Sequence, residues 1–361
     1  MKKILLIFFL ALVALTGCKK DPAPEQNQNP NVFAQNANCY IVSKAGTYSF
    51  IPTKGGSSAV EDIHFVRVLW ESYGTDIAPA VGDLVHSVSF SDNKITFTAT
   101  DKKGNAVIAA RDASSRILWT WHIWMTDEPE ECKYANGAGV MMDRNLGATS
   151  AEPGDVGALG LLYQWGRKDP FLGSSSISSS TLANSTIIWP SAVSSNSSNG
   201  TIAYATANPT TFIAYNSSNL DWYFTGSTHT DNTRWTTSEA DKSIYDPCPA
   251  GWRVPDGGNN GVWSKTLGSS KRFGGFPYDS SNEGMNFSGK FGADQTIWYP
   301  ASGYRSYYDG SLDYVGDAGG YWSASLSSYR AYLMDLDSDG FVTPSSDNSR
   351  ASGQSVRCVK E

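Results

Sequence analysis

The sequence predicts a mainly β protein, and three observations lead to this prediction. Short runs of apolar or alternating residues recur along the first third of the chain, with turn residues between them. Gly, Ser, Asn, Thr, Tyr and Trp are abundant throughout. Stretches with the 3.6-residue period of an amphipathic helix are scarce. We therefore expect sheets joined by short turns.

Seven strands are expected in the first folded region, at residues 39–42, 47–51, 64–70, 84–90, 94–100, 106–111 and 117–124. Turn signals separate several of them, as at Lys54-Gly-Gly, Ser91-Asp-Asn and Lys103-Gly-Asn. Seven strands in about 90 residues fit an immunoglobulin-like β-sandwich, which we place at 38–127.

The amino-acid composition of the chain changes after a polar hinge at 127–131. Residues 132–361 are richer in Gly, Trp and Tyr, and their expected strands are short and irregular. We place a second, α+β domain there. One insert, at 173–200, is rich in Ser and Asn and is expected to form a long surface loop.

The N-terminus has the pattern of a lipoprotein signal peptide at residues 1–17. Two lysines precede an apolar run that is too short to span a bilayer as a helix. Gly17 then precedes Cys18, which is where lipoprotein signal peptidase cuts and a lipid is attached. An ordinary secretory signal with a chance cysteine is the alternative. We expect an outer-membrane lipoprotein at the cell surface, although the sequence leaves a periplasmic orientation open.

Residues 18–37 have almost no apolar content, so they should form a disordered tether. The net charge is −7, and no cluster of Lys or Arg is present. Nucleic acid and anionic lipid are therefore not expected as partners, and the lipid anchor is the only expected contact with the membrane.

Four cysteines follow Cys18, and an even number in an oxidising compartment predicts two disulfides. Three pairings are possible. We favour Cys39–Cys132 with Cys248–Cys358.

Signatures of known enzyme classes are missing. The histidines are dispersed, and the chain contains no H-E-x-x-H, C-x-x-C, G-x-S-x-G or P-loop pattern. We therefore expect no catalytic residues, no metal and no cofactor. Asp335-Leu-Asp337-Ser-Asp339-Gly340 resembles the start of a calcium loop, but Ser346 stands where a glutamate is required. A β-hairpin with a Ser-Asp-Gly turn is the better interpretation.

Six ordered motifs in the second domain resemble those of the Fibrobacter succinogenes major paralogous domain. They are Met142-Asp-Arg-Asn-Leu-Gly147, Leu162-Tyr-Gln-Trp-Gly-Arg167, Cys248-Pro-Ala-Gly-Trp-Arg-Val-Pro255, Tyr299-Pro-Ala-Ser-Gly-Tyr-Arg305, Gly319-Gly-Tyr-Trp-Ser-Ala324 and Ser355-Val-Arg-Cys-Val-Lys360. The resemblance implies a fold similar to C-type lectin-like domains. It also implies bacterial surface lipoproteins, some connected with fimbriae or glycan contact. The first domain resembles, more loosely, those of fimbrillin-type surface proteins of Bacteroidetes.

The chain departs from the active relatives of that fold. The Glu-Pro-Asn and Trp-Asn-Asp sugar-binding motifs of calcium-dependent lectins do not occur. Formylglycine-generating enzymes need reactive cysteines near their cleft, whereas Cys248 and Cys358 lie in framework motifs. Neither calcium-dependent sugar binding nor formylglycine generation is therefore expected of this chain.

Aromatic residues in polar surroundings are the predicted binding residues, because sugar rings stack on such side chains. One group is the tyrosine loop, which carries Tyr304, Arg305, Tyr307, Tyr308 and Tyr314. A second group contains Trp222, Tyr223 and Trp235. For the tyrosine loop, packing into the core is an equally strong interpretation.

These observations favour a non-enzymatic adhesin or glycan-binding lipoprotein, whose partner is a glycan or another ligand on a host or bacterial surface. A fimbrial subunit that exchanges a strand with its neighbours is the first alternative. An enzyme on a lectin-like scaffold is the second. A removable edge strand within 38–127 would favour the fimbrial subunit. A pocket with converging carboxylates would favour the enzyme.

Overall fold

The computed structural model describes residues 30–215, 220–226, 234–236, 241–268, 272–291 and 296–361. The expected signal peptide (1–17), Cys18 and the first part of the tether lie outside these ranges. Within them, strands far outnumber helices, which confirms the mainly β fold class. None of the described helices has both the length and the apolar character needed to cross a bilayer.

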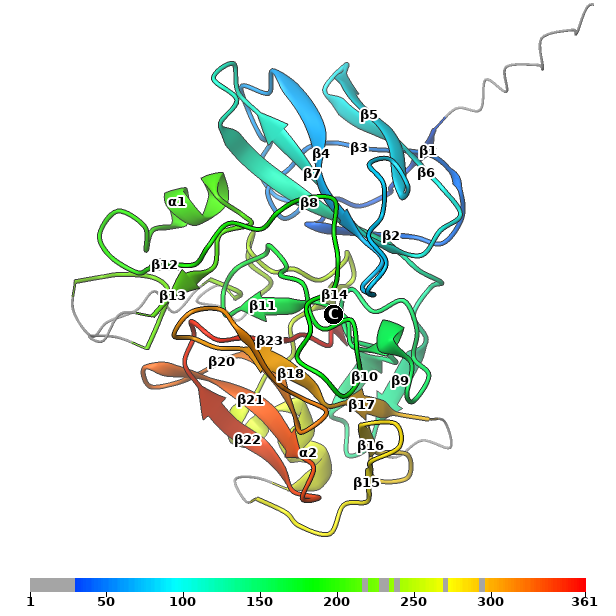
Figure 1. Cartoon of the computed structure of the whole chain (residues 1–361), viewed down its shortest axis with the longest axis vertical. Helices are drawn as coiled ribbons and strands as arrows, with labels where there is room; N and C mark the ends of the chain where they lie inside the picture. Colours follow the sequence, from blue (N-terminus) through cyan, green and yellow to red (C-terminus); the bar gives the residue numbers. More distant parts are fainter. Residues whose placement is uncertain (1–29, 216–219, 227–233, 237–240, 269–271, 292–295) are drawn as a thin grey trace, which may run out of the picture.

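Two four-stranded sheets form the upper part of the molecule in Figure 1 and are called here the sheet pair. One contains, in spatial order, β1 (Asn31–Val32), β3 (Gly46–Phe50), β6 (Lys94–Ala99) and β5 (Val85–Ser91). The other contains β2 (Cys39–Val42), β8 (Ile117–Met125), β7 (Gly104–Arg111) and β4 (Phe65–Ser72). All seven strands expected between 38 and 127 are therefore confirmed.

Burial of the two sheets explains their sequence patterns. β6 alternates between buried and more exposed residues because only one of its faces is covered. Almost every residue of β7 is buried, because one face of its sheet packs against β3 and β6 and the other against residues beyond 140. Phe50, Phe97 and Trp121 belong to the buried cluster between the sheets.

The expected tether is too long at its C-terminal end. Asn31 and Val32 form β1, which pairs in parallel with Tyr48 and Ser49 of β3. The Phe33 ring lies 4.6 Å from the Tyr40 ring, and Ala37 is fully buried. Ordered structure therefore begins before residue 38, because these few residues find partners that composition alone does not reveal.

The second region, residues 131–361, contains several small sheets in the lower part of Figure 1. Its largest sheet has the order β11 (Leu162–Gln164), β23 (Gly353–Ser355), β18 (Ser302–Arg305), β20 (Ala318–Ser327), β21 (Arg330–Asp337) and β22 (Val342–Asn348), with β19 (Leu312–Val315) paired to β18. A four-stranded sheet has the order β14 (Trp252–Arg253), β24 (Val359–Lys360), β10 (Gly139–Met142) and β9 (Glu131–Tyr134).

Smaller elements complete this region. They are the three-stranded sheet of β15 (Tyr278–Asp279), β16 (Gly284–Asn286) and β17 (Trp298–Pro300), the pair β12 (Val193–Ser194) and β13 (Ile213–Ala214), the helices α1 (Ile202–Ala207) and α2 (Val262–Leu267), and the 3-10 turns η1 (Val156–Ala158) and η2 (Gly258–Asn260). The Thr201 hydroxyl caps α1 by accepting a hydrogen bond from the Tyr204 amide (3.0 Å).

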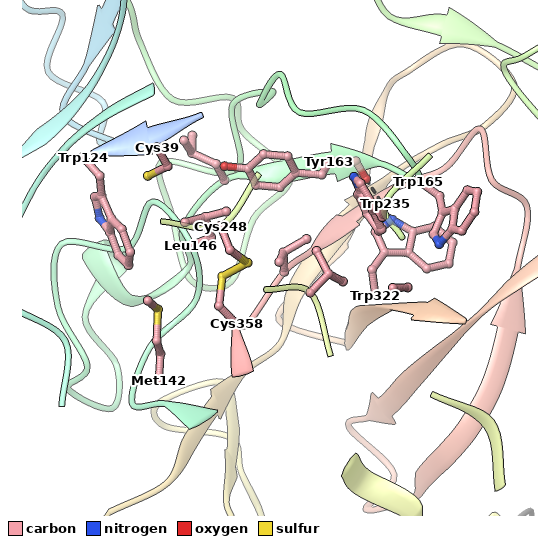
Figure 2. Close-up of a cluster of buried hydrophobic side chains, with 14 of the residues drawn as sticks. Cys39, Trp124, Met142, Leu146, Tyr163, Trp165, Trp235, Cys248, Trp322 and Cys358 are labelled. Carbon is pink, nitrogen blue, oxygen red and sulfur yellow. Dashed lines mark hydrogen bonds between the residues drawn. A yellow bond between two sulfur atoms is a disulfide. The ribbon is translucent and has the colours of Figure 1, made fainter. Parts of the chain in front are cut away.

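One buried cluster joins the sheet pair to the second region. Cys39, Trp70, Val107 and Trp124 come from four strands of the sheet pair, and they pack with residues between 142 and 358. Figure 2 shows the Cys248–Cys358 disulfide between Trp124 on one side and three indoles of the second region on the other. The Trp124 indole also donates to the Ala148 carbonyl (2.8 Å). Packing is thus continuous across the predicted boundary at 127–132.

The favoured disulfide pairing is confirmed for one bridge and wrong for the other. Cys248 and Cys358 form a disulfide. Cys39 and Cys132 are both buried, and neither is part of a disulfide. They are not placed to pair, because they belong to different buried clusters, Cys39 on β2 of the sheet pair and Cys132 on β9 of the second region.

The insert at 173–200 packs more closely than its composition predicts. Its backbone follows the outer edge of β4, where the Thr186 amide donates to the Glu71 carbonyl (3.0 Å). The Trp189 ring lies 5.6 Å from the Trp70 ring. The expected hairpin at 335–340 is confirmed, since β21 and β22 pair in antiparallel fashion and Gly340 takes a positive φ of 80° in the turn.

Candidate functional site

The tyrosine loop is a short connection between β18 and β19, which pair in antiparallel fashion. The Ser306 amide donates to the Ser311 carbonyl (2.7 Å), and the Asp309 carboxylate accepts from the Ser311 amide (2.9 Å). The loop is therefore closed by its own hydrogen bonds, as expected for a loop with strands on either side.

Two tyrosines at the strand ends form a stacked pair. The Tyr304 and Tyr314 rings lie 5.3 Å apart with an interplanar angle of 16°. Tyr314 is 57% exposed, so one side of this pair is open to solvent. Tyr314 also has a φ of 59°, a left-handed conformation that bulky residues rarely adopt.

Three further tyrosines gather at the tip of the loop. The Tyr307 and Tyr308 ring centroids are 4.2 Å apart. The Tyr215 ring meets both of them edge to face, at 5.1 Å and 5.0 Å. Tyr308 is 61% exposed. We call the five rings of Tyr215, Tyr304, Tyr307, Tyr308 and Tyr314 the tyrosine face.

A charged, buried base lies beside Trp222, which packs in one cluster with Tyr215 and Tyr307. The Asp221 carboxylate binds both the Arg234 guanidinium (3.0 Å to Nη1) and the Arg350 guanidinium (3.5 Å). The Arg234 guanidinium lies 4.8 Å from the Trp222 ring centroid. Because its charges are paired out of water, this base is a rigid support for the Trp222 ring.

Three predicted binding residues are buried, so their assignment as ligand contacts is wrong. Trp222 and Trp235 are fully buried, and their indoles donate to the Trp165 carbonyl (2.8 Å) and the Arg167 carbonyl (3.2 Å). Arg305 is buried, and its guanidinium donates to the Leu172 and Gly310 carbonyls (3.0 and 2.8 Å). Turn residues flank them in the sequence, but tertiary packing covers them.

The remaining predicted residues lie together. Tyr223 is half-buried and packs in one cluster with Tyr215 and Tyr307. Tyr215 was missed at the sequence level, because it is about 90 residues from the loop. The backbone hydrogen bond from the Tyr215 amide to the Tyr307 carbonyl (2.8 Å) brings it there.

The Tyr304 and Tyr307 phenols of the tyrosine face stay protonated at neutral pH. Desolvation, together with the neighbouring Tyr314, Asp313 and Asp335, raises the pKa of Tyr304 to about 12. A hydrogen bond with Tyr308, followed by desolvation, raises the pKa of Tyr307. Each hydroxyl can therefore both donate and accept a hydrogen bond.

A large cavity lies elsewhere, at the junction of the sheet pair and the second region. It has a volume of about 660 Å³ and is lined by five carboxylates (Asp127, Glu130, Asp143, Glu152 and Asp155) with Lys103 and Arg144. Arg144 binds Asp143 in bidentate fashion (2.9 and 2.8 Å). Asp127 is paired with Lys103. No tyrosine lines this cavity.

A buried Cys–His–Asn arrangement escaped the sequence analysis. The Cys39 thiol lies 3.4 Å from Nδ1 of His122, whose Nε2 lies 2.9 Å from Oδ1 of Asn105. Burial lowers the pKa of His122 to about 3 and raises the pKa of Cys39. The thiol is therefore protonated and shielded from solvent. Asn105 also donates to the Gly147 carbonyl (2.8 Å), so this group links the sheet pair to the second region.

Within the described ranges, no group of three His, Cys, Asp or Glu side chains is placed to hold a metal ion. Comparisons of the chain with protein-family models, with curated proteins and with solved structures found no match.

Proposed function

We propose that this chain is a lipid-anchored, non-enzymatic surface protein that binds a glycan through the tyrosine face. The observation that carries the proposal is the gathering of five tyrosine rings, two of them more than half exposed, beside a buried cluster that includes Trp222. Sugar C–H faces stack on such rings, and phenol hydroxyls bond sugar hydroxyls. A large exposed aromatic group has no role in solubility, whereas it suits contact.

The architecture supports the same proposal. The sheet orders β8-β7-β4 and β3-β6-β5 resemble those of an immunoglobulin-like sandwich, although β2 pairs with β8 and not with β3, and such a sandwich would act as a spacer above the tether. The irregular second region, with framework motifs around Cys248 and Cys358, is consistent with a C-type lectin-like domain of the Fibrobacter succinogenes major paralogous family. It would present the binding surface.

A glycan array probed with the full chain tests the binding role. Wild type should bind at least one oligosaccharide, and Tyr307→Ala with Tyr308→Ala should weaken that binding at least about fivefold, since each ring contact contributes about 0.5–1.5 kcal/mol. Tyr307→Phe with Tyr308→Phe keeps the rings and should retain most of the affinity. Val81→Ala with Ile188→Ala removes two exposed apolar side chains elsewhere and is the matched control.

The outcomes of the array separate the interpretations. An array without any bound glycan contradicts the proposal. Equal binding by wild type and the Tyr→Ala double variant also contradicts it, since the ligand would then lie elsewhere.

Membrane fractionation tests the anchor. Cys18→Ser should move the protein from the membrane fraction into the soluble fraction, because no acyl chain can be attached. A Cys18→Ser protein that stays with membranes after a high-salt wash would contradict lipid anchoring.

An enzyme is the second candidate, and the junction cavity is the observation that favours it. Its volume suits a small ligand, and carboxylates from both parts of the chain line it. Glycan hydrolysis that is abolished by Glu130→Gln with Glu152→Gln, but not by changes in the tyrosine face, would support this candidate instead.

A further inference from the structure

The charges around the tyrosine face are mainly negative. Asp309 and Asp313 belong to the loop itself, and Asp309 is exposed. Hydrogen bonds from Ser311 lower the pKa of Asp309, so it is ionised at neutral pH. Asp335 of β21 lies close enough to Tyr304 to affect its pKa. Three carboxylates therefore border the five rings.

Cations close to this face are already engaged. Arg330 lies within electrostatic reach of Tyr307, and its guanidinium binds the Asp347 carboxylate (3.1 Å). Arg305 lies beneath the loop, but it is buried and its donors bind backbone carbonyls. Counting Asp347 and Arg330, the exposed or half-buried charges near the face are four carboxylates and one guanidinium group among the described residues, whereas the guanidinium groups of Arg234, Arg305 and Arg350 are buried.

This balance determines which sugars can bind. A sugar carboxylate or sulfate would need a cationic donor and would meet ionised aspartates instead. A neutral sugar hydroxyl can donate to the Asp309 and Asp313 carboxylates and accept from the tyrosine hydroxyls. The local chemistry is therefore suited to a ligand that carries many hydroxyl groups and no negative charge.

The rings also lie in two groups. Tyr304 and Tyr314 stack at the strand ends, whereas Tyr307, Tyr308 and Tyr215 meet at the tip of the loop. Each group offers an aromatic surface for one sugar ring, so two or more linked sugars can be in contact at once. Simultaneous contacts increase affinity over that for a single sugar.

We propose that the tyrosine face selects uncharged oligosaccharides and discriminates against acidic glycans. This inference rests on the proposed glycan-binding function, and it adds the ligand class and the residues, Asp309 and Asp313, that set it.

Matched pairs of probes on the full chain test the selection. Each pair has one core in a neutral form and an acidic form, such as lacto-N-neotetraose and its sialylated derivative. Wild type should bind a neutral member through the tyrosine face. Its affinity for the acidic member should be at least about threefold lower at low salt, and this difference in affinity should shrink at high salt.

Charge removal provides the second readout. Asp309→Asn with Asp313→Asn should strengthen binding of the acidic member by about three- to tenfold, while an asparagine oxygen can still accept from the Ser311 amide. The affinity for the neutral member should change by a smaller factor. Asp92→Asn with Asp101→Asn removes the same charge from exposed sites on the sheet pair and should leave both affinities unchanged.

Failure of this inference can be distinguished from failure of the proposed function. Tyrosine-dependent binding in which acidic members bind as well as or better than neutral ones would overturn the inference alone. Unchanged acidic binding in the Asp→Asn loop variant would also overturn it. If no probe binds in a way that depends on Tyr307 and Tyr308, the proposed function fails and the inference fails with it.

Discussion

Tyr314 combines two properties that folding alone does not favour, a left-handed backbone and an exposed aromatic ring. Its φ of 59° costs about 1–2 kcal/mol for a residue with a Cβ atom. Its ring is 57% exposed, so burial of the ring offsets only a small part of this strain energy. Strained residues of this kind concentrate at functional sites, which agrees with a role in ligand contact.

Replacement of Tyr314 separates its backbone from its ring. Tyr314→Ala loses the stack on Tyr304 and keeps the strain, whereas Tyr314→Gly loses the stack and relieves the strain. The glycine variant should therefore be more stable than the alanine variant by about 1 kcal/mol in urea unfolding. Both should lose glycan affinity to a similar extent. A glycine variant less stable than the alanine variant would contradict the strain argument.

The two buried cysteines outside the disulfide provide another residue-level prediction. In a Cys18→Ala chain, a thiol reagent should find almost no reactive cysteine in the native state and two after denaturation, because Cys39 and Cys132 are buried. Cys39→Ser should reduce the count to one. A count of zero after denaturation would mean that Cys39 and Cys132 are bridged after all.

Single residues were the least predictable from the sequence. Trp222 and Trp235 stand beside turn residues, yet both indoles lie in the core and bond distant carbonyls. Arg305 stands within the tyrosine loop, but its side chain points under it and binds Leu172, 133 positions away. Local polarity predicts exposure only where no distant segment covers the residue.

At the scale of elements, the strands of the sheet pair were predictable, because a half-buried strand has its own two-residue period, as in β6. The insert at 173–200 was not. Its partner is β4, and the contact from Thr186 to Glu71 spans 115 positions. A Ser-rich composition gives no sign of such a contact. The short strand β1 escaped prediction for the same reason.

The hairpin of β21 and β22 carries a group that titrates in the acidic range. Burial, followed by repulsion from Asp337, raises the pKa of Asp335 to about 6. An unfolded aspartate has a pKa of about 3.9, so the folded chain holds a proton more tightly. This group therefore lowers stability as pH rises from about 4 to about 6 and has no further effect above that range.

Asp335→Asn tests this expectation. The variant should be more stable than wild type at pH 7.5, by about 1–3 kcal/mol, and the two should converge near pH 4. Thermal unfolding across this pH range provides the measurement. Asp339→Asn, in the exposed turn of the same hairpin, is the control. If the stability difference between Asp335→Asn and wild type instead grows towards pH 4, the raised pKa of Asp335 is contradicted.

The whole molecule is held together by a core that no local pattern predicts. The sequence indicates two domains, but Trp70 and Trp124 of the sheet pair share one buried cluster with Trp165 and Trp322. Asn38 reinforces the junction by donating to the carbonyls of Ile244 and Asp246 (both 2.8 Å). The change in amino-acid composition after residues 127–131 therefore does not mark a boundary in packing.

Shared packing should make unfolding cooperative. We expect a single transition in calorimetry, with a calorimetric enthalpy equal to the van't Hoff enthalpy. Trp124→Ala should lower this transition as a whole, by about 3–5 kcal/mol, because it leaves a cavity at the junction. Two separate transitions, of which only one responds to Trp124→Ala, would contradict a common core.

The central claim is that a sugar contacts the tyrosine face, and NMR of a chain with ¹³C-labelled tyrosine rings tests it most directly. During titration with the oligosaccharide that binds best, the signals of Tyr304, Tyr307, Tyr308 and Tyr314, assigned through single Tyr→Phe variants, should shift with a common dissociation constant. The signals of the buried Tyr134, Tyr299 and Tyr321 should stay in place. Saturable binding that leaves the four loop signals unmoved would contradict the claim.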